Sequence, residues 1–193
     1  MNVRPAPERT KPVNLPHAMV QNLSSGRIRA LALPLGQYEH MKRGDLLWVR
    51  EGVTVADRQR RKDELVLSYA GDARRYHIAW PALLAKPGAG YRPADAMPVQ
   101  TSRFTLVVDQ VERLRLANVT EDDAVAAGAQ PDGDGYSALG YPFMKPCTSA
   151  VDALAFLYGQ LHPGGGRNPE VVLIRFHAVA KNIARYAVDR GRF

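Results

Sequence analysis

Hydrophobic residues in this chain occur in short runs that are separated by turn-forming and charged residues. Most runs contain β-branched and large apolar residues over lengths typical of β-strands. The strongest is SRFTLVVDQV at 102–111, which we expect to continue to Leu116 with a bend. The pattern predicts further strands over 27–33, 46–49, 64–69, 74–80 and 170–176.

Three segments have the features of short helices. The first covers 17–23, directly after a proline that suits a first helical turn. Thr120 can cap the second, which Gly128 ends, and Thr148 or Ser149 begins the third. Apolar side chains recur at helical spacing in the third, at Val151, Leu154, Leu157, Tyr158 and Leu161.

The connections between these elements are too irregular for a series of alternating strand–helix units. We therefore expect an α+β protein, with a small mixed, mostly antiparallel β-barrel that is partly open and carries two or three short helices. An extended arm is expected at 1–16, one domain at 17–180 and a basic tail at 181–193. Residues 54–98 resemble an insertion between core strands, and 129–147, rich in Gly and Pro, are expected to be loop.

The composition is that of an ordinary globular protein, with 46% hydrophobic and 23% charged residues. No apolar run approaches the ~18 residues that a membrane span needs. The first residues lack the apolar stretch of a secretory signal, and one cysteine, Cys147, allows no internal disulfide. These features predict a cytoplasmic protein with no membrane partner.

The net charge of +7 is distributed unevenly along the chain. Residues 1–62 contain 12 of the 26 Lys and Arg but only 5 of the 19 Asp and Glu, whereas the remainder holds 14 of each. A basic region of this kind indicates attraction to a polyanion, most often a nucleic acid. The alternative is a solvated, Arg-rich surface without a partner.

The stretch GDLLWVREGV at 44–53 places a pair of opposite charges at the end of a predicted strand. Neighbouring residues on a strand point to opposite faces, so at most one of Arg50 and Glu51 faces the core. Core packing does not require such a pair. The stretch therefore predicts either a charged rim or a binding site.

No standard catalytic motif is present in the sequence. The three glycines at 164–166 lack the Lys-Ser/Thr of a phosphate-binding loop, and the five histidines have no metal-ligand spacing. Cys147 has no histidine near it in sequence, which favours a spectator thiol over a nucleophile. We therefore expect no metal and no cofactor.

Four motifs, taken together and in order, closely resemble the ASCH-domain proteins of bacteriophages and prophages. They are GDLLWVREGV, MPVQTSRFTLVVDQV, the helix ending in DAVAAGA, and NPEVVLIRF, spanning roughly 25–179. The resemblance implies a PUA-like β-barrel that recognises RNA or a nucleotide in a cleft between barrel and helices. It also implies a bacterial host cell as the setting.

Some small bacterial ASCH proteins are amidohydrolases that use a lysine, a threonine and a glutamate. The chemistry needs a nucleophile, a base that activates it and a carboxylate. The matching positions here hold Ile28, Leu31 and Ala127, which are all apolar. That catalytic route is therefore not expected in this chain, which resembles a pseudoenzyme of the family.

The candidate site is a basic, ligand-binding one, made of Arg27, Arg29, Arg50, Glu51 and Arg103, with no catalytic residue. Arg27 and Arg29 lie on one face of a predicted strand and suit phosphate groups. An ion pair such as Glu51 with Arg103, closing the end of the barrel, is the structural alternative. The expected ligand is RNA or a nucleotide, with DNA also possible.

Two other functions fit the same sequence. One is a divergent amidohydrolase or nuclease in which Glu51, with Arg50, activates a water molecule. The other is a phage accessory protein that docks on a host or virion protein through residues 54–98.

Overall fold

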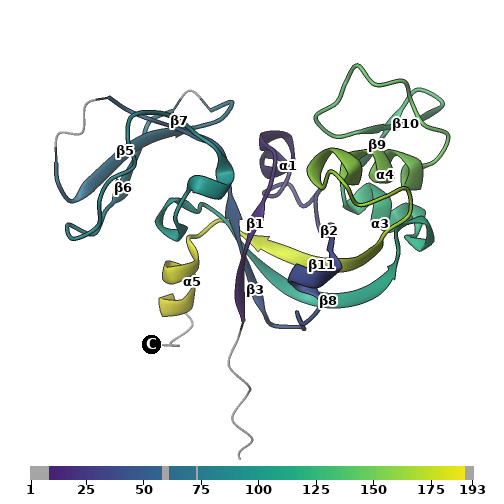
Figure 1. Ribbon diagram of the computed structural model, residues 1–193, viewed down its shortest axis with the longest axis horizontal. Coiled ribbons are helices and arrows are strands. Elements are labelled where there is room, and N and C mark those ends of the chain that lie inside the picture. The colour runs from purple at the N-terminus through teal and green to yellow at the C-terminus, as the bar shows by residue number, and fades with distance from the viewer. Residues whose placement is uncertain (1–8, 58–60, 73, 190–193) are drawn as a thin grey trace, which may run out of the picture. The chain divides into compact units, whose positions relative to one another are not determined.

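The computed structural model describes residues 9–57, 61–72 and 74–189 (Figure 1). Half of the expected arm at 1–16, the centre of the charged run at 57–63 and two of the arginines in the tail therefore lie outside the described residues. The described chain divides into two compact units. Unit 1 comprises 9–10, 18–46 and 106–178, and unit 2 comprises 11–17, 47–105 and 179–189.

Unit 1 is built on strands β8, β11 and β2, which lie side by side in that order. They are Thr105–Arg115, Glu170–Val179 and Ala30–Pro34. β11 and β2 are antiparallel, with Ile174 opposite Leu31. A hairpin of β9 (Ala129–Asp132) and β10 (Gly135–Ala138) forms a second, two-stranded sheet.

The helices of unit 1 pack on this framework and enclose a hydrophobic core with it. α3 (Glu121–Ala126) and α4 (Ala150–Leu161) pack against each other, and α4 also packs on the β9–β10 hairpin (Figure 1). The core includes Leu154 and Tyr158 on the predicted apolar face of α4. A short α2 (Leu35–Tyr38) follows β2, and a 3-10 turn, η3 (Leu116–Asn118), follows β8.

Unit 2 contains two groups of strands. β1 (Thr10–Asn14) lies beside β3 (Leu46–Arg50). The second group is a four-stranded sheet in the order β6-β5-β4-β7, antiparallel throughout, with a core that includes Leu65, Tyr69 and Trp80. Its strands are Tyr76–Ala79, Glu64–Tyr69, Val53–Val55 and Gly90–Arg92.

The remaining elements are short. Two 3-10 turns, η1 (Ala94–Ala96) and η2 (Val99–Thr101), precede β8, and α5 (Ile183–Asp189) follows β11. α1 (His17–Gln21) begins with the last residue of the first segment of unit 2 and continues into unit 1. None of the helices in the described part of the chain is long and apolar enough to cross a membrane.

The structure confirms an α+β chain whose registered strand pairs are antiparallel. Five α-helices are present in the described residues, which is more than the two or three expected. Among these residues, the strand orders are open and close no barrel. The sequence prediction of loop at 129–147 was wrong for β9 and β10, since Gly133 at φ 58° allows a tight turn between strands that contain a proline and an aspartate.

The predicted strand at 27–33 was wrong in its start, because β2 begins at Ala30. Arg27 and Arg29 precede the strand and therefore do not share one of its faces. The backbone of Arg29 bonds instead to two other segments: its N–H donates to the carbonyl of Ala126 at 3.0 Å, and its carbonyl accepts from the N–H of Phe176 at 2.9 Å. Tertiary hydrogen bonds thus fix a non-strand conformation here.

The N-terminus of α4 is capped as the sequence predicted. The hydroxyl of Ser149 accepts a hydrogen bond from the Asp152 N–H at 3.0 Å and donates to that residue's carboxylate at 2.8 Å. We expect Ser149→Ala to lower the free energy of unfolding of unit 1 by about 1 kcal/mol, because the N–H of Asp152 loses its hydrogen-bond acceptor. Urea unfolding followed by far-UV circular dichroism would measure it. Thr148→Ala, next to the cap, should have no comparable effect.

Candidate functional site

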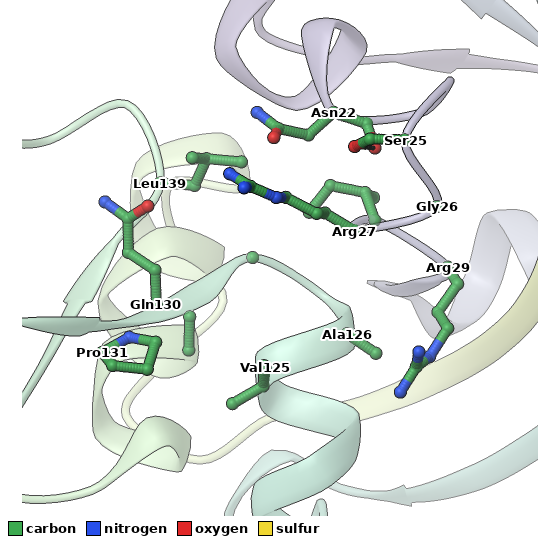
Figure 2. A pocket seen from close by; sticks show the side chains of 13 residues that line it. Asn22, Ser25, Gly26, Arg27, Arg29, Val125, Ala126, Gln130, Pro131 and Leu139 are labelled. Atoms are coloured by element: carbon green, nitrogen blue, oxygen red, sulfur yellow. Dashed lines mark hydrogen bonds between the residues drawn. The ribbon is translucent and has the colours of Figure 1, made fainter.

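A cavity of about 380 Å³ lies within unit 1 (Figure 2). Its walls come from three parts of the chain: residues 22–29, which connect α1 to β2; residues 125–131, from the end of α3 into β9; and Leu139, just after β10. Backbone hydrogen bonds stabilise the first segment and join the other two. Ile28 donates to the carbonyl of Asn22, and Leu139 donates to that of Gly128.

The apolar floor of the cavity includes Ile28, one of the three apolar residues that the sequence resemblance aligns with catalytic positions. Ile28 lines the cavity, as do both neighbours of Ala127, while the buried Leu31 lies in β2 and is not among the described lining residues. A Cβ atom added at Gly128 would lie 3.8 Å from Cδ1 of Ile28. The structure therefore brings the segments of Ile28 and Ala127 together, as an apolar surface.

Two arginines provide positive charge at this cavity. The side chains of Arg27 and Arg29 are exposed, and that of Arg27 forms no hydrogen bond or ion pair with any residue that the structure describes. In Figure 2, the side chain of Arg27 extends across the cavity toward Leu139, whereas that of Arg29 points away from Arg27. Arg27 is therefore free to bind an anion.

Arg29 interacts electrostatically with a cluster of acidic residues next to α3. There the guanidinium of Arg175 donates to both carboxylate oxygens of Asp123, at 2.7 and 2.6 Å, and to Glu112. The hydrogen bonds from Arg175 lower the pKa of Asp123, and the positive charge of Arg29 adds to this effect. This ion pair fixes α3, which supplies one wall of the cavity, to β11.

Two amide side chains complete the polar part of the cavity. Asn22 Nδ2 donates to the carbonyl of Ala18 at 2.8 Å, and Gln130 Nε2 donates to the hydroxyl of Ser137 at 3.3 Å. The lining residues that the structure describes include no His, Asp, Glu, Lys or Cys. This part of the cavity therefore offers donors, acceptors and apolar surface, but no group suited to general acid–base catalysis.

The other three predicted site residues lie in unit 2 and are not among the described residues lining this cavity. Glu51 and Arg103 form a two-pronged ion pair, with Nε–Oε1 at 3.0 Å and Nη2–Oε2 at 2.6 Å. The side chain of Glu51 is only 3% exposed. Both carboxylate oxygens are thus occupied, which is the structural alternative considered from the sequence.

Aromatic rings and a second carboxylate surround this ion pair. The guanidinium of Arg103 lies 3.9 Å from the ring centre of Tyr69 and donates to Asp72 at 3.4 Å. The hydroxyl of Tyr76 donates to Asp72 at 2.6 Å, which lowers the pKa of Asp72 and raises that of Tyr76. Burial raises the pKa of Tyr69. This network has the connectivity of a structural clamp.

Arg50 is also held by protein groups. Its Nε donates to Asn14 Oδ1 at 2.7 Å and its Nη1 to the carbonyl of Asp95 at 3.2 Å, and the guanidinium lies 5.6 Å from the ring centre of Trp48. These contacts join β3 to β1 and to η1.

Sequence reasoning overlooked Asn22 and Gln130, because a lone amide side chain has no motif that distinguishes a cavity wall from a surface.

Comparison with known proteins identifies no relative. No family model, curated protein or solved structure matches this chain.

Proposed function

We propose that this protein binds RNA or a nucleotide in the cavity of unit 1 and does not use the amidohydrolase route. One observation carries the proposal: the unpaired guanidinium of Arg27 extends across a cavity that has an apolar floor. Such a guanidinium suits a phosphate group, and the apolar floor suits the face of a base. The apolar residues at the positions of the amidohydrolase catalytic groups also support binding without that chemistry.

The size of the cavity favours one nucleotide unit over a duplex. Its volume of about 380 Å³ is near the lower end of the range for small-molecule sites, roughly 300–1,000 Å³. A single nucleotide, free or splayed out of a strand, can place its phosphate at Arg27 and its ring against Ile28. This binding mode is typical of single-stranded RNA recognition.

The ASCH family, its PUA-like barrel and the phage or prophage origin belong to the same proposal. The four sequence motifs support them, together with the antiparallel α+β framework. An experimental structure of the whole chain, in which the strands of both units can be ordered, would test the barrel. A partly open barrel is the expected result.

Arg27→Ala is expected to weaken binding of a short single-stranded RNA about tenfold, because one charge-assisted contact to a phosphate is lost. Filter binding at salt concentrations between about 50 and 200 mM would measure both affinity and its salt dependence. The slope of log affinity against log salt should fall by about 0.7 in the variant, which corresponds to one phosphate contact.

Arg167→Ala is the matched control, since it removes the same charge from the exposed loop between α4 and β11. Its affinity for the RNA should stay close to that of the unmodified protein. Equal losses in both variants would show that net charge alone drives binding. Absence of any salt-dependent affinity for RNA or nucleotides would contradict the proposed function.

A further inference from the structure

We propose that this cavity selects bases carrying an exocyclic amino group over those with a keto oxygen at the same ring position. This inference rests on the proposed function and specifies the ligand class of the same site. It follows from the orientation of two amide side chains, Asn22 and Gln130. Each is fixed through its nitrogen and turns its oxygen to the cavity.

The environment of Asn22 determines which end of its amide faces the cavity. Its Nδ2 donates to the carbonyl of Ala18, one helical turn earlier, at 2.8 Å. Its backbone carbonyl accepts from the hydroxyl of Ser25 at 3.1 Å and from the N–H of Ile28 at 3.3 Å. The residue is thus held at both its backbone and its side chain, and Oδ1 receives no hydrogen bond from a described residue.

The side chain of Gln130, on the opposite wall of the cavity, is also held through its nitrogen. Its Nε2 donates to the hydroxyl of Ser137 at 3.3 Å, and the two residues are directly paired in the β9–β10 ladder. Ser137 is buried, so its hydroxyl has a fixed surrounding. The Oε1 atom of Gln130 receives no hydrogen bond from a described residue.

Figure 2 shows both amide oxygens turned toward the side of the cavity that Arg27 crosses, with both nitrogens turned away. The cavity therefore combines a cationic donor with two carbonyl acceptors. An exocyclic amino group donates two hydrogen bonds, which suits these acceptors. A keto oxygen at the same position would face acceptor oxygens with no proton of its own to donate, which costs binding free energy.

Two pairs of nucleotides test this difference, because their members share the phosphate and differ only in the exocyclic group and in the proton of the adjacent ring nitrogen. They are CMP with UMP, and AMP with IMP. In each pair the first member carries an amino group where the second carries a keto oxygen. NMR titration of the backbone amides of the full-length protein gives the dissociation constant of each nucleotide. We expect the amino member of at least one pair to bind about ten- to a hundredfold more tightly.

Gln130→Met tests whether the amide oxygen is the cause. Methionine keeps the length of the side chain and removes the acceptor, so the ratio of affinities within the selective pair should fall toward one. Gln160→Met, on the exposed side of α4 and outside the cavity, is the control and should leave the ratio unchanged.

The outcomes separate the two proposals. Equal binding of both members of both pairs would overturn the amino-group selectivity while leaving nucleotide binding in place. Binding of none of the four nucleotides, together with no affinity for RNA, would overturn both. An unchanged ratio in Gln130→Met would also contradict the inference, since the selectivity would then have another origin.

Discussion

Replacing Glu51 with glutamine should lower the free energy of unfolding of unit 2 by about 3 kcal/mol. Glutamine has nearly the same shape but no charge, so the guanidinium of Arg103 loses its principal counter-ion. The Glu51 side chain is 3% exposed and that of Arg103 is 22% exposed, so water cannot replace the lost partner well. Asp72, at 3.4 Å, compensates only in part.

Tryptophan fluorescence during urea unfolding would measure this effect, because both tryptophans, Trp48 and Trp80, lie in unit 2. Glu170→Gln, at an exposed position of β11, removes the same charge and should change stability little. The double variant Glu51→Leu with Arg103→Met should recover much of the loss, since neither charge remains buried. A single Glu51→Gln variant as stable as the unmodified protein would contradict the clamp.

The second large effect is expected at the ion pair behind the cavity. Asp123→Ala should destabilise unit 1 by about 2 kcal/mol, because Arg175 loses two charge-assisted hydrogen bonds to a carboxylate that is 13% exposed. Asp123 also accepts a hydrogen bond from the hydroxyl of Thr120, the cap of α3. Far-UV circular dichroism during urea unfolding is suitable here, since α3 and α4 lie in unit 1.

This effect should depend on pH. The pKa of Asp123 is lower in the folded protein than its ordinary value of 3.8, chiefly because of the hydrogen bonds from Arg175. The unfolded chain therefore binds a proton first as pH falls, and the stabilisation is complete above the ordinary pKa and lost as pH falls through the lower, folded pKa. The difference between the unmodified protein and Asp123→Ala should be constant near neutral pH and shrink below about pH 4.

Asp122→Ala provides the control, because this neighbour is an exposed acidic residue in the same first turn of α3. It should cost only the small dipole contribution, about 0.5 kcal/mol. Other carboxylates with lowered pKa values, Asp72 and Asp189, titrate in the same range. Comparing each variant with the unmodified protein at every pH removes their shared contribution. Equal losses at the two positions would show that the bond to Arg175 is unimportant.

Particular elements show where sequence reasoning succeeds. The strand at 64–69 appears with the predicted bounds, and Thr120 and Ser149 cap their helices as expected. These features depend on neighbours within a few residues, which the sequence displays directly. The hairpin at 129–138 was overlooked because its strands contain Pro131 and Asp132, residues that disfavour strands when considered locally.

For the candidate site too, the sequence revealed some residues and only the tertiary structure revealed others. The sequence identified Arg27 and Arg29 as candidate ligand-binding residues, and both line one cavity together with Ile28. Their pairing with Gln130, about a hundred residues later, depends on the contact of the 22–29 segment with α3 and β9. No periodicity or motif encodes such a contact, so the amide walls of the cavity became visible only in three dimensions.

The sequence by itself determined the α+β class and the caps of the two main helices, because each depends on residue type and local order. The tertiary structure alone decided which charges are paired and which are free. Glu51 and Arg103, 52 positions apart, meet within unit 2 and satisfy each other, whereas Arg27 has no partner among the described residues. The physical reason is that burial and proximity, which the folded chain creates, decide whether a charged side chain acts as a structural clamp or is left to bind a ligand.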